Sequence, residues 1–243
     1  MVLPFDPPAA APLYRQVKEI LVARIAKGDW RPGDMLPSEP KLAAELGVSP
    51  GTVRKALDEM TSDKLVQRRQ GRGTFVATTT SDSALFHFFK LVDDDRRPMM
   101  PESRELSRLI RIATADERRV LKLGPKERVV CIRRLRASRG TPMMVETVTL
   151  PLRRFPEMEG YAEEFPNTLY DLYQFRFNVT VRQVTEVLRA VTATEEDSAL
   201  LKVEVDSPLL EIDREAFTFD HEPVEWRVSR LDTRHAAYLN VID

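Results

Sequence analysis

Residues 49–60 read Ser-Pro-Gly-Thr-Val-Arg-Lys-Ala-Leu-Asp-Glu-Met, and this stretch predicts a short amphipathic helix. Ser49 can cap the helix by accepting a hydrogen bond from a backbone N–H group, and Pro50 suits the first helical position. Apolar residues recur at spacings of three and four and therefore share one face: Val53, Ala56, Leu57 and Met60. The opposite face carries one hydroxyl group and two cations near the helix start: Thr52, Arg54 and Lys55.

A short helix with a buried back and a cationic front fits the DNA major groove. An ordinary amphipathic surface helix has the same pattern, so the neighbouring segments decide between the two. Ser38 opens an earlier helix, and Gly47 ends it as a left-handed stop. Only Val48 separates that stop from Ser49, which predicts a helix-turn-helix. Another helix precedes the pair, with an apolar face made by Leu13, Val17, Ile20, Leu21 and Ile25.

Residues 65–76 predict a hairpin, because two β-prone ends flank a Gly-Arg-Gly tip. Arg72 is the only bulky residue at this tip, so the backbone of the hairpin can approach a phosphate or a minor groove closely. A plain solvated hairpin is the alternative, but its place directly after a helix-turn-helix favours a DNA-contacting wing. The predicted DNA-contacting residues are Ser38, Ser49, Thr52, Arg54, Lys55, Gly71, Arg72 and Gly73.

The composition of the 243 residues bounds the class of protein. The segment from Met1 to Ala77 holds 12 Lys and Arg against 9 Asp and Glu, and the rest holds 25 against 29, which agrees with the net charge of −1. Cys131 is the only cysteine, and the three histidines show no metal-ligand spacing, so we expect no disulfide, metal or cofactor. No apolar run is long enough to span a bilayer, which predicts a soluble cytoplasmic protein without a membrane segment.

Several linked motifs in the first part of the chain resemble the winged helix of GntR-family bacterial repressors. They lie at residues 12–17, 33–39, 47–57 and 71–76, and the resemblance covers roughly residues 12 to 77. Many family members have an arginine after the serine of the third motif, where this chain has Pro50. One base or phosphate contact is therefore missing, and the operator sequence cannot be transferred from the family.

The remainder of the chain predicts an α+β domain on an antiparallel sheet. Residues 128–150 and 208–231 read as two long hairpins, and each follows a short helix that begins after an Ala-Thr pair. These pairs are Ala113-Thr114 and Ala193-Thr194, and their offset of roughly 80 residues indicates a unit used twice rather than a solenoid, which needs three or more repeats. A short helix at 168–175 and a strand at 180–190 are expected between them. We predict domains at 1–77 and 85–243 with a polar linker at 78–84.

Charged residues within the apolar strands are candidate ligand contacts. Arg134 and Arg136 point to the same face of their strand, while Glu146 and Glu225 lie in the return strands of the two hairpins. If that face is solvated, these are ordinary surface charges. If it lines a pocket, the arginines would bind an anion in a fork and the glutamates would bind hydroxyls or amines. Two neighbouring guanidiniums repel each other, so we also expect an anion between them.

These strands resemble the UTRA effector domain of the HutC subfamily, over roughly residues 84 to 243. The motifs include Arg134-Leu135-Arg136, Glu146-Thr147, a Thr-Leu-Tyr sequence from Thr168 and Pro223-x-Glu225-Trp226. The resemblance implies a fold similar to chorismate lyase and a bound effector. An aromatic segment at 86–89 argues against a phosphosugar and favours a small organic acid. The effector residues implied or expected are His87, Phe88, Arg134, Arg136, Glu146, Thr168, Tyr170 and Glu225.

The sequence therefore predicts a homodimeric transcriptional regulator, of repressor type, that binds a two-fold operator in double-stranded DNA and a small anionic effector. A lyase-like enzyme with an added DNA-binding domain is the alternative, but the chain lacks a metal constellation, a nucleophile–base pair and a phosphate loop. A nonspecific nucleic-acid binder is the third possibility. The small positive excess between Met1 and Ala77 argues against it, because nonspecific affinity depends on phosphate neutralisation.

Overall fold

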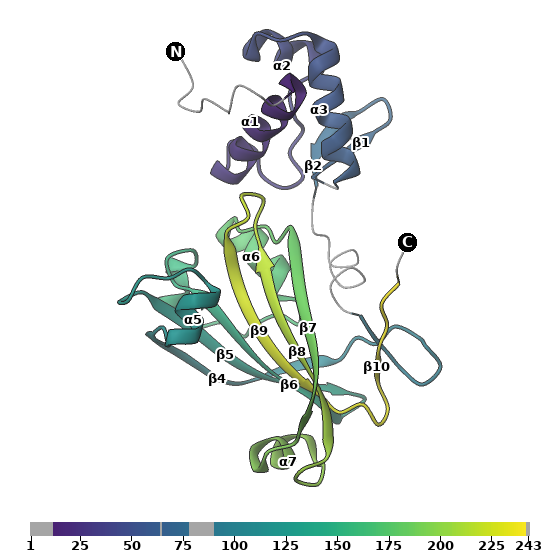
Figure 1. Ribbon diagram of the computed structural model, residues 1–243, viewed down its shortest axis with the longest axis vertical. Helices are drawn as coiled ribbons and strands as arrows, with labels where there is room; N and C mark the ends of the chain where they lie inside the picture. Colours follow the sequence, from purple (N-terminus) through teal and green to yellow (C-terminus); the bar gives the residue numbers. More distant parts are fainter. Residues whose placement is uncertain (1–11, 64, 78–89, 242–243) are drawn as a thin grey trace. The chain divides into compact units, whose positions relative to one another are not determined.

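The computed structural model describes residues 12–63, 65–77 and 90–241, which form two compact units (Figure 1). The expected arm at 1–11, the linker at 78–84 and the aromatic segment at 86–89 lie outside the described residues. The N-terminal unit contains three helices and a two-stranded hairpin: α1 (Leu13–Lys27), α2 (Glu39–Leu46), α3 (Pro50–Ser62), β1 (Val66–Arg69) and β2 (Gly73–Val76).

The predicted helix-turn-helix is present, with the predicted caps. Gly47 ends α2 with a φ of 67°, in the left-handed region. At the start of α3, the Ser49 hydroxyl accepts a hydrogen bond of 3.1 Å from the Thr52 N–H group, and Pro50 is the first helical residue. The predicted apolar face of α3 packs against α1 and α2 in a common core that includes Leu21, Leu42, Val53, Ala56, Leu57 and Met60.

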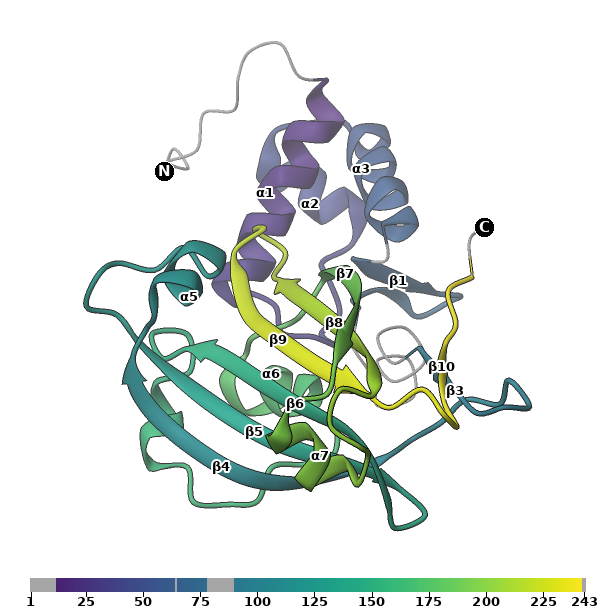
Figure 2. The same cartoon turned by 60° about the horizontal axis from the view of Figure 1, so that its bottom comes forward.

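The C-terminal unit is built on a six-stranded antiparallel sheet in the order β4-β5-β6-β9-β8-β7 (Figure 2). A separate two-stranded ribbon pairs β10 with β3. The bounds of the strands are β3 (Leu91–Val92), β4 (Glu102–Ile112), β5 (Arg128–Ser138), β6 (Thr141–Pro151), β7 (Gln183–Thr192), β8 (Pro208–Phe217), β9 (Pro223–Leu231) and β10 (Ala237–Tyr238).

The sheet confirms the prediction of a repeated unit. β4, α5 (Ala115–Val120), β5 and β6 form one half, while β7, α7 (Glu195–Leu201), β8 and β9 form the other. The halves meet through the antiparallel pairing of β6 with β9. Each short helix begins with a capping box, which Thr114 makes with Glu117 and Thr194 makes with Asp197. Such boxes satisfy backbone donors that a short helix would otherwise leave unpaired.

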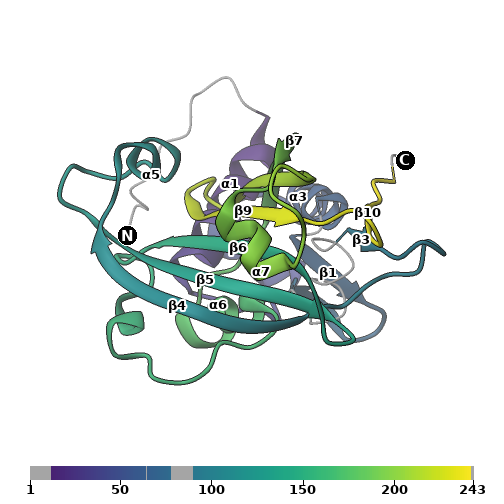
Figure 3. The same cartoon turned by 90° about the horizontal axis from the view of Figure 1, so that it is seen from below.

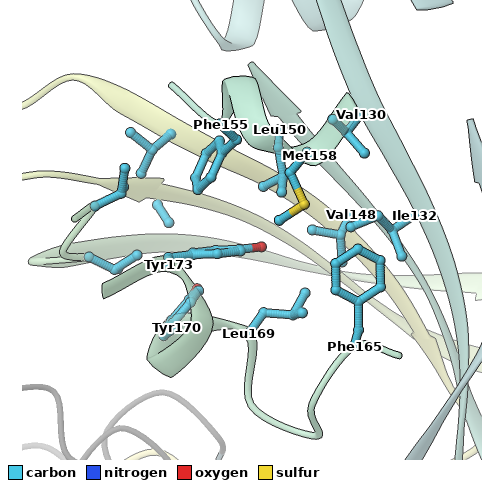
Figure 4. Close-up of a cluster of buried hydrophobic side chains, with 14 of the residues drawn as sticks. Val130, Ile132, Val148, Leu150, Phe155, Met158, Phe165, Leu169, Tyr170 and Tyr173 are labelled. Carbon is cyan, nitrogen blue, oxygen red and sulfur yellow. The ribbon is translucent and has the colours of Figure 1, made fainter. Parts of the chain in front are cut away.

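The two faces of this sheet are covered by different helices (Figure 3). One face packs against α6 (Leu169–Phe177) and the 3-10 helix η1 (Pro156–Gly160). In that core the rings of Phe155 and Tyr173 lie 4.9 Å apart, beside alternate residues of β5 and β6 such as Ile132 and Val148 (Figure 4). The intervening residues of the same strands, such as Leu135 and Val145, pack beneath α7 on the opposite face. Both faces of the central strands are therefore buried.

The strand β4 and the ribbon strands β3 and β10 were not predicted. β4 reads Glu-Ser-Arg-Glu-Leu-Ser-Arg-Leu-Ile-Arg-Ile, and its apolar residues alternate poorly because the strand has a bulge between Glu105 and Ser107. β3 and β10 contain two residues each, too few to show a period. The strand expected at 180–190 runs from 183 to 192 instead, and the helix expected at 168–175 ends at Phe177. These shifts are typical of element ends.

Candidate DNA-binding surface and effector site

The front of α3 carries the predicted hydroxyl and cations on the solvent side. The Thr52 hydroxyl lies 2.9 Å from that of Ser49, so the two side chains brace the start of the helix. Arg54 is 63% exposed. Lys55 lies with its Nζ 4.1 Å from the centroid of the Tyr14 ring, which is within cation–π distance. Both predicted cations of this helix are thus exposed.

One carboxylate joins α2, α3 and the hairpin. Glu39 is the first residue of α2, where the positive end of the helix favours a negative charge. Its Oε2 accepts a hydrogen bond of 2.9 Å from Arg54 Nε, and its Oε1 accepts one of 3.2 Å from Arg68 Nη2. Arg68 also pairs with Asp58 at 2.8 Å. Glu39 and Asp58 were not predicted to belong to this surface, and their acidic character gave no reason to include them. Ser38 precedes α2, but its side chain makes no capping hydrogen bond.

The tip of the β1–β2 hairpin needs its glycines. Gly71 and Gly73 have φ values of 68° and 114°, which side-chain-bearing residues adopt rarely. A Cβ on Gly73 would also lie 3.3 Å from the Met35 sulfur. Arg72, between them, is exposed, and its N–H group donates to the Arg69 carbonyl at 2.9 Å. The tip therefore presents the exposed Arg72 between two glycines.

In the C-terminal unit, Arg134 and Arg136 are buried beside Glu146. The Oε1 atom of Glu146 accepts hydrogen bonds of 2.6 Å from Arg134 Nε and 2.9 Å from Arg136 Nε. Arg136 also donates to the carbonyls of Pro101 and Asn167. The expectation that a bound anion must separate the two arginines does not hold, because the protein's own carboxylate lies between them. Nor is Glu146 a surface charge, since its side chain is only 1% exposed.

Glu225, the second predicted glutamate, is completely buried and also paired. Arg227 donates to both of its oxygens, at 3.0 and 2.8 Å, and reaches Glu146 Oε2 at 3.4 Å. The hydroxyl groups of Tyr170 and Tyr173 donate to Glu225 at 3.1 and 2.7 Å. The two predicted glutamates therefore belong to one hydrogen-bonded cluster that joins β5, β6, β9 and α6.

A third part of the cluster lies on β8 and β7. Arg214 Nε donates to Glu186 Oε1 at 2.7 Å, and the Tyr238 hydroxyl of the ribbon donates to Glu186 Oε2. The sequence analysis did not predict five members of the cluster: Arg214, Arg227, Glu186, Tyr173 and Tyr238. The repeat could have indicated Arg214, because it occupies the position in β8 that Arg134 occupies in β5.

The cluster shifts the pKa values of its members. Complete burial alone would raise the pKa of Glu146, but the three nearby guanidiniums outweigh it and lower that pKa far below the usual range. Burial, opposed by Glu146, lowers the pKa of Arg136 to about 10. Burial and the neighbouring Glu225 raise the pKa of Tyr170 to about 12. At neutral pH Glu146 and Arg136 are therefore charged, and the Tyr170 hydroxyl is a hydrogen-bond donor.

A small cavity of about 20 Å³ adjoins this cluster, and its volume suits roughly one water molecule. Polar groups on its wall include Lys90, Glu146, Arg214, Arg227, Ser229 and Tyr238. Three cations against one carboxylate make this cavity attractive to an anion. Arg134 and Arg136 are absent from its wall.

Thr168 precedes α6, where a donor to an effector was expected. Its hydroxyl donates to Asp171 Oδ2 at 2.7 Å and is thus engaged within the protein. His87 and Phe88 lie outside the described residues. Within the described ranges, no group of three or more His, Cys, Asp and Glu side chains is placed to hold a metal ion. No helix in that part of the chain is long and apolar enough to cross a membrane.

Two family models match the chain, one for each unit. The model for the UTRA domain matches residues 96–236, which is more than half of the chain, and the model for bacterial regulatory proteins of the gntR family matches residues 13–76. The chain belongs to the GntR family. Within that family it is a regulator of the HutC type, in which a winged helix-turn-helix precedes a UTRA domain, as the sequence motifs predicted.

Relatives of this GntR-family protein include named repressors. It is 28% identical over 232 residues to the HTH-type transcriptional repressor NagR of Bacillus subtilis, covering 92% of this chain and 94% of NagR. It is 29% identical over 231 residues to the histidine utilization repressor of Pseudomonas putida, covering 93% and 90%. The ligand-binding domain of a protein assigned to the GntR family from Bordetella bronchiseptica has the same fold, with a TM-score of 0.56 and 31% identity. That match covers 63% of this chain and 96% of the other.

Proposed function

We propose that this GntR-family regulator is a homodimeric repressor that binds operator DNA through α3 and the β1–β2 hairpin and is controlled by a small anionic metabolite. The exposed front of α3 carries the DNA-binding part of the proposal. Its start is capped, its back is buried, and Arg54 extends from it 63% exposed. The repressor names of relatives such as NagR support the sign of regulation.

Removing either of two exposed arginines tests the DNA-binding surface. We expect Arg54→Ala and Arg72→Ala each to weaken operator affinity by roughly 1–3 kcal/mol, because each loses a base or phosphate contact. Fluorescence anisotropy with a fragment of the native promoter measures this loss. Arg119→Ala is the matched control, since Arg119 is also exposed, at 72%, but lies on α5 of the other unit. Wild-type affinity in both Arg54→Ala and Arg72→Ala would refute the assignment.

An excess of positive charge in the C-terminal unit supports an anionic effector. The buried cluster contains four guanidiniums and three carboxylates: Arg134, Arg136, Arg214 and Arg227 against Glu146, Glu186 and Glu225. The surplus cation favours a ligand with one negative charge, such as a carboxylic acid. We place the ligand's anionic group at the cavity wall beside Arg214, Arg227 and Lys90. Thr168 and Tyr170 stay predicted effector contacts within this proposal.

The cavity of about 20 Å³ is too small for an organic acid, so binding requires the wall to move. The ribbon strands β3 and β10 contribute Leu91 and Tyr238 to that wall. An effector that binds only the moved state shifts the population toward it. Operator release follows if that state holds the two DNA-binding units of the dimer in a geometry that no longer fits both half-sites.

A thermal-shift screen of carboxylic acids against their matched neutral amides tests the charge of the effector. A ligand that binds only the native state raises its apparent stability, so we expect an acid to stabilise the protein and its amide to have no effect. Arg214→Gln should weaken binding of that acid more than tenfold, because a hydrogen bond to a charged group contributes about 1.5–3 kcal/mol. Operator affinity without effector should stay unchanged.

In Arg214→Gln, Glu186 retains its hydrogen bond from Tyr238, so the fold has a remaining partner for that carboxylate. Arg189→Gln is the control, since Arg189 lies on the neighbouring strand and forms a half-exposed pair with Asp213. An amide that stabilises as strongly as its acid, or an undiminished response in Arg214→Gln, would contradict the proposed site.

A further inference from the structure

The strand β7 forms one edge of the six-stranded sheet and has a partner on one side only. Every residue along it pairs with β8. Its other side has no strand partner among the residues that the structure describes. Val187 and Leu188 in its middle are 46% and 44% exposed, and they point to opposite faces of the sheet. A strand added along this edge would cover both side chains and satisfy the unpaired backbone groups.

The other edge strand, β4, has features that oppose such pairing. It contains a bulge between Glu105 and Ser107. Arg108, in its middle, pairs with Glu105 and donates to the backbone carbonyls of Tyr161 and Glu163, so a loop is held against that edge. Bulges, charges and covering loops are the devices by which proteins block edge pairing. β7 pairs with β8 without a register shift.

We propose that β7 pairs antiparallel with β7 of a second copy of this chain, joining the two sheets across a two-fold axis. The inference rests on the proposed homodimer and assigns its contact surface. An antiparallel pair of identical strands is two-fold symmetric, so it gives a closed dimer and leaves no further β7 edge open. Such a contact uses only the C-terminal unit.

Symmetry limits the register of this pairing. The two-fold axis is perpendicular to the joined sheet, so a residue and its copy point to the same face. Directly opposed side chains also share a face, so opposed residues are an even number of positions apart. One residue must therefore lie opposite its own copy. Centring on Val187 places Gln183 opposite Val191 of the second copy, and centring on Leu188 places Val184 opposite Thr192. Both registers use nearly the whole strand. Centring on Glu186 or Arg189 would place like charges opposite each other, which is destabilising.

In both allowed registers, no two like charges lie directly opposite each other. With Val187 at the centre, Thr185 lies opposite Arg189 and Glu186 lies opposite Leu188 of the second copy. With Leu188 at the centre, Val187 lies opposite Arg189. Glu186 already has Arg214 as its partner inside each subunit, and Arg189 has Asp213. Neither register therefore leaves an unpaired charge on the contact.

A single cysteine at the centre of the strand tests the contact in the full-length protein. Opposed residues of an antiparallel pair have Cα atoms about 4.5–5.5 Å apart, which suits a disulfide. We expect either Val187→Cys or Leu188→Cys to form a disulfide-linked dimer under mild oxidation, seen on a non-reducing gel. Wild type, whose only cysteine is the buried Cys131, and Ile112→Cys on the β4 edge should remain uncrosslinked. Ile112 is 59% exposed and lies opposite Arg128, so the new thiol has no cysteine across the strand pair. A dimeric protein in which neither β7 variant crosslinks overturns the proposal.

Lysine at the same positions gives an independent measurement. In the register centred on that residue, Val187→Lys or Leu188→Lys places two cations opposite each other, so light scattering should show a shift from dimer to monomer with an unchanged circular dichroism spectrum. Leu109→Lys should stay dimeric. Dimers that persist in both β7 variants overturn the β7 contact but leave the homodimer intact. A monomeric wild type that protects a single operator half-site in footprinting would instead refute the homodimer itself.

Discussion

Glu146→Gln should lower the free energy of unfolding of the C-terminal unit by about 3–5 kcal/mol, because removing one partner leaves a buried charge uncompensated. Glu146 is 1% exposed and accepts hydrogen bonds from three arginines, so its loss leaves Arg134 and Arg136 repelling each other at close range. Arg227 retains its pair with Glu225. A glutamine side chain has nearly the same shape, so the change isolates the charge.

Urea denaturation followed by tryptophan fluorescence measures this loss. The chain has two tryptophans, and the Trp30→Phe background leaves only Trp226, on β9 of the C-terminal unit, as the reporter. Glu159→Gln in the same background is the control. Glu159 pairs with Arg128 on the surface and is 56% exposed, so this change should cost far less stability than Glu146→Gln. Equal effects of the two substitutions would contradict a structural role for the buried cluster.

The pH dependence of the free energy of unfolding should distinguish Glu146→Gln from Glu159→Gln. Because the pKa of Glu146 is lowered in the folded protein, the unfolded chain binds its proton first as the pH falls through about 4.5. The stabilisation from Glu146 is therefore complete above that pH and decreases on acidification. Glu117 and Asp197 also have lowered pKa values, so wild type and Glu159→Gln lose stability together. The difference in the free energy of unfolding between wild type and Glu146→Gln should therefore narrow towards low pH, because only wild type loses the contribution of Glu146.

Leu57→Ala should destabilise the N-terminal unit by about 2–5 kcal/mol, the range for truncating a fully buried leucine. Leu57 is 1% exposed and anchors the back of α3 against α1 and α2. Operator affinity should fall at temperatures where this unit melts. Binding of an effector to the other unit should persist, because the cluster of Glu146 and its arginines contains no residue of the N-terminal unit.

Leu13→Ala provides the matched control for Leu57→Ala. Leu13 begins α1 and is 52% exposed, so the same chemical change removes little buried surface there. Thermal unfolding in a Trp226→Phe background, with Trp30 as the reporter, compares the two variants. A loss in Leu13→Ala as large as that in Leu57→Ala would mean that burial does not account for the stability of α3.

Local chemistry made the N-terminal unit predictable. The cap at Ser49, the glycine stop at Gly47 and the apolar spacing of α3 all act within a few residues, so the sequence alone determined this helix-turn-helix. The pairing of Arg54 with Glu39 was not predictable in the same way. Those residues lie 15 positions apart on different helices, and only the packing of α2 against α3 brings them together.

The C-terminal unit shows the same division between local and long-range effects. Alternation along a strand determined that Arg134 and Arg136 share a face, and the repeated Ala-Thr helix starts determined the two halves of the sheet. Only the tertiary structure decided that Glu146 would lie between those arginines and that Arg227 would join from β9, 81 residues away from Glu146. Strand alternation specifies a face but not which neighbouring strand covers it, so the partners of a buried charge depend on the order of strands in the sheet.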